Sequence, residues 1–128
     1  MKYKLILSDN LPSHVGGRCS YPWYPVYGTC TVTIRPKYKN DIGLLNHELK
    51  HVEQYETRWY HSLLTRFSKA YVYKVELEAY TEQIKEYKYT ELKQANWIVG
   101  ALVNKYNLDV SYEQVGTDVL KIIKENRE

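Results

Sequence analysis

The stretch 41-DIGLLNHELKHVEQY-55 decides how this chain is expected to fold. Asp41 is a residue type that caps helix N-termini, so the helix is expected to begin beside it. The apolar residues that follow recur at helical spacing and form one stripe: Ile42, Leu45, Leu49 and Val52. His47 and His51 lie off this stripe, on a neighbouring face. The pattern predicts an amphipathic helix with two histidines beside its apolar side.

Residues 47–51 of this helix read His-Glu-Leu-Lys-His, which is an H-E-x-x-H motif. Two histidines four apart share a helix face and can hold one Zn²⁺ together. Glu48, beside the first histidine, is then placed to take a proton from a metal-bound water. The alternative is a surface helix with two solvated histidines, but the amphipathic context favours a metal site.

A catalytic zinc site takes three protein ligands and one water, so a third ligand is expected from another element. The helical segment 74-KVELEAY-80 offers Glu76 and Glu78. Carboxylates two positions apart on a helix diverge by about 200°, so both cannot face the same ion. The spacing alone does not decide between them.

The residues before the motif are typical of strands and loops. Lys2 to Leu7 alternates weakly, and residues 9–29 are rich in proline and glycine, as loops are. Cys30 to Arg35 is the best strand, because it is rich in β-branched residues and stops at Pro36.

The residues after the motif are helical in pattern. A short apolar segment covers 59–67, a long helix is expected from Ala70 to about Tyr89, and a third ends near Asn107. Ser111 opens a capping-box pattern for a last helix. We therefore expect one α+β domain, residues 1–128, with a small N-terminal antiparallel β-sheet followed by a mainly helical bundle that carries the H-E-x-x-H helix.

The composition of the 128 residues excludes several classes of protein. Hydrophobic residues make up 44% and charged residues 26%, which is typical of globular domains. The net charge of +3 comes without a dense basic face, so no nucleic-acid partner is expected. No apolar run is long enough to span a membrane, and the apolar part of residues 1–8 is too short for a secretory signal. A soluble, cytoplasmic protein is expected, and nothing in the sequence indicates its oligomeric state.

Two cysteines, Cys19 and Cys30, flank the turn-rich loop. A disulfide between them would suit an exported protein, but a cytoplasmic protein favours free thiols. Their spacing is not that of a zinc knuckle. We expect both to be reduced and to take no part in catalysis.

The motif and its downstream glutamates resemble those of the zincin metallopeptidases, and of the gluzincins in particular. In several such families the second helix carries E-x-E-A followed by Asp or Asn, and the first glutamate binds zinc. Residues 76–79 read Glu-Leu-Glu-Ala, so the resemblance implies Glu76 as the third ligand. Tyr80 stands where those families place Asp or Asn, so a carboxylate that orients a ligand histidine is missing or comes from elsewhere. Residues 30–85 also resemble small H-E-x-x-H proteins that phages or prophages often encode.

The resemblance implies a peptidase in which His47, His51 and Glu76 hold Zn²⁺. Glu48 is then the base that takes a proton from the metal-bound water. The substrate would be a peptide or protein, paired as an extended chain with the strand Cys30 to Arg35. Attack on the peptide carbonyl would create a negatively charged oxygen that needs a hydrogen-bond donor. The candidates for this donor are Tyr60, His61 and Tyr80.

Two further possibilities remain open from the sequence. His14 and His61 are expected as ordinary surface residues rather than as ligands. The rival to catalysis is a zinc-binding interaction module that acts by contact with a partner protein.

Overall fold

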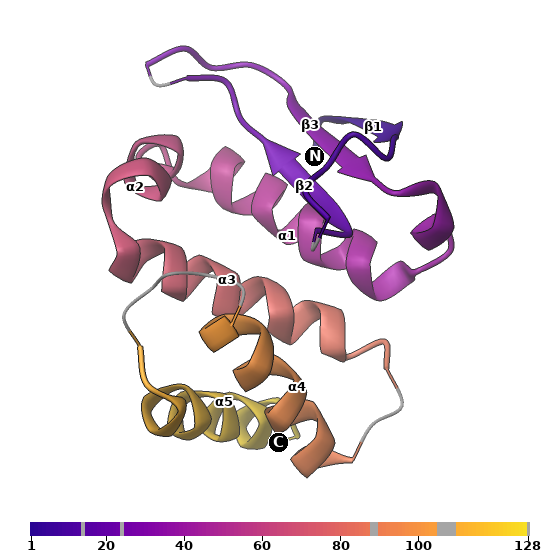
Figure 1. The fold of residues 1–128 in the computed structure, drawn as a ribbon. Helices are drawn as coiled ribbons and strands as arrows, with labels where there is room; N and C mark the ends of the chain where they lie inside the picture. Colours follow the sequence, from indigo (N-terminus) through magenta and orange to yellow (C-terminus); the bar gives the residue numbers. More distant parts are fainter. Residues whose placement is uncertain (14, 24, 88–89, 105–109, 128) are drawn as a thin grey trace.

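A computed structural model describes residues 1–128 except 14, 24, 88–89, 105–109 and 128, and shows a small sheet followed by helices (Figure 1). The strands are β1 (Tyr3–Leu7), β2 (Gly17–Ser20) and β3 (Cys30–Ile34). A short 3₁₀ helix, η1, covers Pro36–Tyr38. The α-helices are α1 (Ile42–Thr57), α2 (His61–Phe67), α3 (Lys69–Ile84), α4 (Glu91–Asn104) and α5 (Tyr112–Arg127). The expected α+β class is confirmed.

The sheet has the strand order β1-β3-β2, so β3 is the central strand. β2 pairs with β3 antiparallel, but β1 pairs with it in parallel. The expectation of a wholly antiparallel sheet is therefore wrong. Strand alternation in a sequence reports which residues face the core, and it carries no information on strand direction. Residues between β1 and β3, including β2, make the crossover that a parallel pair requires.

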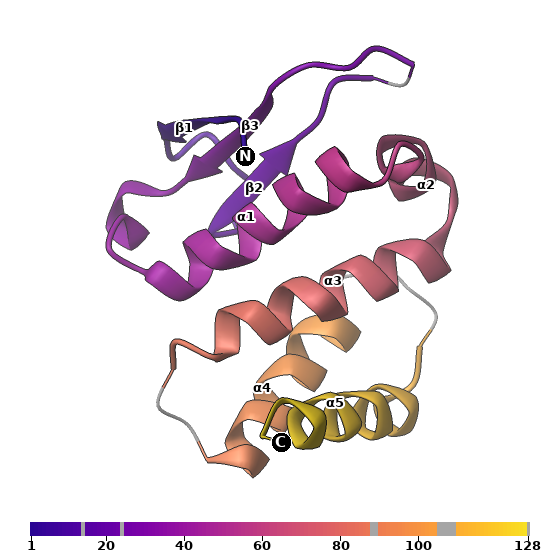
Figure 2. The same ribbon diagram turned by 180° about the vertical axis from the view of Figure 1, so that it is seen from behind.

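The elements are stacked in layers, with α1 between the sheet and α3, and with α4 and α5 beyond α3 (Figures 1 and 2). On β3, the alternate residues Cys30, Val32 and Ile34 are buried and form a small core with Val52 and Tyr55 of α1. A second core joins the far side of α3 to α4 and α5. The two cores leave α1 and α3 facing each other across the middle of the molecule.

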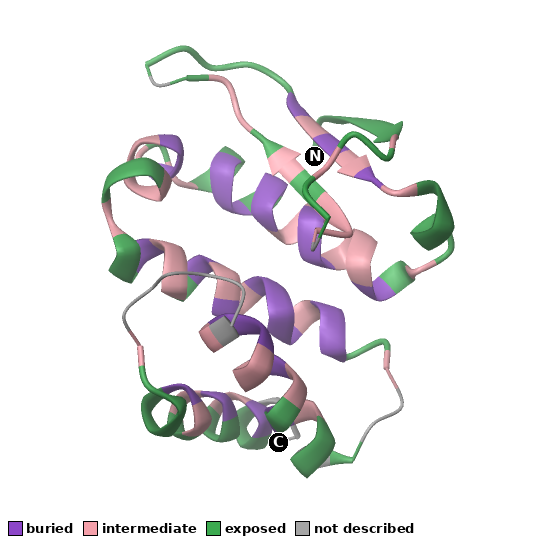
Figure 3. Cartoon of the chain, in the orientation of Figure 1, coloured by how far each residue is buried: buried purple, intermediate pink, exposed green. Residues whose placement is uncertain are grey.

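Helix α1 begins where the sequence predicts, because the Asp41 carboxylate accepts a hydrogen bond from the Leu44 amide at 3.0 Å. Its burial is two-sided, which the apolar stripe did not predict. Val52 of the stripe is fully buried, whereas Ile42 is 53% exposed. The buried residues of α1 include the polar residues His47, Glu48, His51 and Gln54, and Figure 3 shows buried positions along both α1 and α3. The polar side of the predicted helix is therefore interior.

The later helices follow the sequence prediction except at their ends. Helix α3 begins at Lys69 because the Ser68 hydroxyl caps it, and it ends at Ile84 rather than near residue 89, which lies outside the described residues, as does Asn107. The Ser111 hydroxyl accepts from the Gln114 amide at 3.1 Å, as the capping pattern predicts. Among the residues described, no helix is both long enough and apolar enough to cross a bilayer.

Gly43 lets α1 and α3 approach closely. A Cβ at this position would lie 2.7 Å from the Gln83 carbonyl oxygen and 2.8 Å from a ring carbon of Tyr87. Because the first of these atoms belongs to the backbone, it cannot move away without shifting a helix end. Gly43 therefore fixes the distance between the two helices that carry the candidate site.

We expect Gly43→Ala to lower the free energy of unfolding by about 1–3 kcal/mol, the usual cost of overpacking. Urea denaturation followed by circular dichroism measures it. Gly100→Ala in α4 is the matched control, because nothing lies within 4 Å of the added methyl. That control should stabilise the protein by up to about 1 kcal/mol through helix propensity. Equal effects at the two glycines would contradict a tight helix contact.

Candidate metal site

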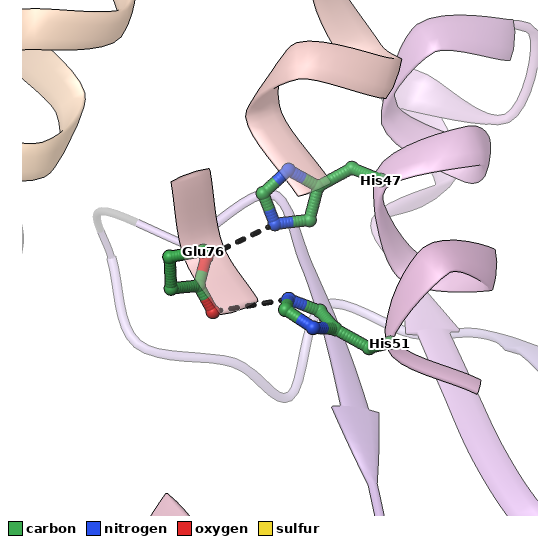
Figure 4. Close-up of side chains that lie close together, drawn as sticks. All are labelled: His47, His51 and Glu76. Carbon is green, nitrogen blue, oxygen red and sulfur yellow. Dashed lines mark ion pairs between the residues drawn. The ribbon is translucent and has the colours of Figure 1, made fainter. Parts of the chain in front are cut away.

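Three side chains from α1 and α3 converge between the two helices. His47 and His51 lie one turn apart on α1, and Glu76 reaches them from the middle of α3 (Figure 4). One Glu76 oxygen is 3.2 Å from His47 Nε2, and the other is 3.0 Å from His51 Nε2. One possible ligand atom from each residue lies within 4.8 Å of the other two.

This spacing suits a shared metal ion. Ligand atoms bonded at about 2.0–2.1 Å around a tetrahedral ion lie about 3.3 Å from each other. The two nitrogen–oxygen distances of 3.2 and 3.0 Å come close to that value. The set of two imidazoles and one carboxylate could therefore hold a metal ion.

Glu78 faces away from the histidines. Its carboxylate accepts two hydrogen bonds from Arg58 Nη2, at 2.6 and 3.0 Å. The structure thus places Glu76 at the site and Glu78 in an ion pair. Two carboxylates two positions apart on a helix point in different directions, so they cannot share one site. The packing of α1 against α3 therefore decides which of the two glutamates faces the histidines, a choice that the sequence spacing left open.

Glu48 is buried beside the ligand set, with only 4% of its surface exposed. Its Oε1 is 3.7 Å from His47 Nε2, and its Oε2 has no hydrogen-bond partner in the described part of the chain. Burial raises the pKa of this carboxyl, Glu76 adds to the effect, and the two histidines oppose it. A carboxylate with a raised pKa and a free oxygen is suited to accept a proton.

The charged forms of Glu76 and His51 stabilise each other. Burial disfavours the Glu76 carboxylate, but His51 and His47 outweigh it and hold its pKa well below the usual range. Burial likewise disfavours a charged His51, yet Glu76 outweighs it and raises the pKa of His51 to about 9. The Glu76 carboxylate therefore depends on positive charge at the histidines, which a metal ion would also provide.

The two histidines differ in what holds their second ring nitrogen. His51 Nδ1 lies 2.9 Å from Gln54 Oε1. His47 Nδ1 has no hydrogen-bond partner among the residues described, and Tyr80 packs against that ring at 4.4 Å between centroids. Sequence reasoning found Tyr80 but missed Gln54, whose position three residues after His51 on the same helix was the available signal.

The site lines a cavity of about 770 Å³. Its wall includes all four site residues, His47, Glu48, His51 and Glu76, and residues 17–19 of β2. The strand expected beside the site, as the partner of an extended substrate, was Cys30 to Arg35, and this expectation is wrong. That segment contains β3, whose two edges are already paired with β1 and β2, so it has no free edge to offer. The strand beside the site is β2.

The other predicted candidates take different places. Tyr80 lines the cavity, while Tyr60 packs its ring on Tyr71 with 5.8 Å between centroids. His61, expected at the surface, is fully buried, because α2 turns it inward and its Nδ1 lies 2.6 Å from the Tyr71 hydroxyl. Burial and the charge of His51 lower the pKa of His61 to about 3. His14 lies outside the residues described.

Both cysteines are free thiols, as expected. Cys30 is buried in the sheet core, and Cys19 lines the cavity.

Comparison of the chain with protein-family models, with curated proteins and with solved structures found no match.

Proposed function

We propose that this protein is a zinc-dependent metallopeptidase. The observation that carries the proposal is the convergence of His47, His51 and Glu76 on one point with Glu48 buried next to them in the same cavity. Two imidazoles, one carboxylate and room for a water are what a catalytic zinc site takes. Nitrogen and carboxylate donors together favour zinc over calcium or magnesium, which take oxygen ligands.

The residues divide the chemistry between them. When bound, zinc supplies a Lewis acid and an activated water. Glu48 would act as the base: its carboxylate would accept a proton from the water that attacks the peptide carbonyl and return it to the nitrogen of the leaving amine as the peptide bond breaks. Burial of Glu48 keeps bulk water from competing for this proton transfer. His47, His51 and Glu76 would hold the ion between α1 and α3.

The edge of β2 supports a peptide as the substrate. The Arg35 amide donates to the Gly16 carbonyl at 3.0 Å, which makes this pair a hydrogen-bonded one in the antiparallel ladder. Pairs alternate along such a ladder, so the backbone groups of Gly17 and Cys19 point away from β3. Both residues line the cavity. An extended peptide can pair with them and place one of its bonds at the site.

The direct test is metal content together with metal-dependent cleavage. Purified protein is expected to carry about one zinc per chain by elemental analysis. His47→Ala should lose this zinc while keeping its helical circular dichroism. A mixed peptide pool should be cleaved by the wild type, not after chelation, and again after zinc is restored. Native protein that neither contains nor takes up zinc would contradict the proposal.

A further inference from the structure

Gln54 connects one candidate ligand to the opposite helix. Its side chain is buried, with an exposure of only 1%. Its Oε1 lies 2.9 Å from His51 Nδ1, and its Nε2 donates to the Val75 carbonyl at 3.1 Å. The same Nε2 is 3.4 Å from an oxygen of Glu78. One amide thus contacts α1 and α3 at once.

These contacts fix which way the amide points. The Val75 carbonyl and the Glu78 carboxylate can only accept hydrogen bonds, so the NH₂ group must face them. The carbonyl oxygen of Gln54 must then face His51, and His51 Nδ1 must be the donor. The nitrogen that remains to ligate a metal is Nε2, the atom that lies 3.0 Å from Glu76.

The amide is itself held in place. Arg58 Nη2 donates to both oxygens of Glu78, at 2.6 and 3.0 Å, and so fixes the carboxylate on which Gln54 rests. The series Arg58, Glu78, Gln54 and His51 joins the C-terminal end of α1 to the middle of α3. His51 is therefore anchored at a ring nitrogen, while His47 Nδ1 has no such partner in the described chain.

We propose that Gln54 is the positioning residue for His51, setting its tautomer and ring orientation for metal binding. This inference rests on the proposed zinc site. Partners of this kind orient the imidazoles of metal ligands and are often carboxylates. Here the buried Glu48 and the half-buried Glu76 already lie nearby, and Glu78 lies beside the amide. A neutral amide accepts the Nδ1 hydrogen without adding a further negative charge.

The test compares two substitutions of Gln54 with a remote control. Gln54→Met keeps the length of the side chain but removes the acceptor, and Gln54→Glu keeps the acceptor. Tyr73→Phe is the control, because it removes a hydrogen bond of 2.6 Å to Asp118, between α3 and α5. The zinc dissociation constant is measured by competition with a chelator. We expect about 10–100-fold weaker binding for Gln54→Met and a smaller loss for Gln54→Glu.

A second readout reports the hydrogen bond itself. In zinc-loaded protein with ¹⁵N-labelled histidine, the His51 Nδ1 proton should exchange slowly in the wild type and in Gln54→Glu, and rapidly in Gln54→Met. A merely structural role would lower stability without changing this proton selectively. Tyr73→Phe should change neither the affinity nor the exchange.

The outcomes separate the inference from the proposed function. Gln54→Met with the zinc affinity of the control would overturn the role of Gln54 and leave the zinc site standing. A wild type that binds no zinc would overturn both. If Gln54→Met fails to fold, the wild-type spectrum decides, because a rapidly exchanging His51 Nδ1 proton there contradicts the anchoring hydrogen bond.

Discussion

Glu48→Gln is expected to keep zinc bound while peptide hydrolysis falls about 10²–10⁴-fold, the usual contribution of a positioned base. The substitution barely changes the size of the side chain, but an amide cannot accept and return a proton. Glu48 is not one of the three residues that converge on the candidate ion, so the ligand set survives. The measurement is kcat/KM on a cleaved peptide, alongside the zinc content of the same sample.

Glu53→Gln gives the matched control. Glu53 lies on the same helix, but its side chain is 51% exposed and pairs with Lys50 on the surface. Its loss should leave both zinc and hydrolysis unchanged. Full hydrolysis by Glu48→Gln would exclude the proposed mechanism. If Glu48→Gln instead keeps zinc and every effect of the protein on a binding partner, the rival interpretation as an interaction module gains support.

Much of α1 could be predicted because its signals are local. The Asp41 cap and the spacing of His47 and His51 follow from the geometry of one helix, and neither needs a tertiary contact. The strand Cys30–Ile34 can also be predicted from local signals, because its β-branched residues favour a strand and its residues are alternately buried. These features depend on neighbours in the sequence, which is what pattern reasoning reads best.

The features that were missed depend on packing between distant segments. The parallel pairing of β1, and hence the position of β2 at the site, follows from how the chain crosses over the sheet. Residue spacing could not choose between Glu76 and Glu78, and only the family resemblance pointed to Glu76, because a helical wheel does not contain the rotation of α3 against α1. Gln54 looks like any polar helix residue until Val75 is placed opposite it.

Glu76→Ala and Glu78→Ala form the sharpest pair of substitutions at the ligand set. Both remove a carboxylate from α3, two positions apart. Glu76→Ala deletes a candidate ligand. Loss of a partner that only orients a ligand weakens metal binding by up to about 100-fold, so Glu76→Ala should weaken zinc binding by well over that amount. Glu78→Ala leaves all three ligands and only loosens the support of Gln54, so its loss should stay within about 10-fold. Competition with a chelator gives both dissociation constants.

Both variants should lose stability once metal is removed. Glu78→Ala breaks the two-bond contact with Arg58, whose other terminal nitrogen is already buried without a partner in the described chain. Glu76→Ala removes a carboxylate whose charged form His51 and His47 stabilise, and it leaves His51 without its opposite charge. In chelator, both variants should therefore melt at a lower temperature than the wild type. Weaker zinc binding by Glu78→Ala than by Glu76→Ala would move the ligand to Glu78 and contradict the arrangement of the site.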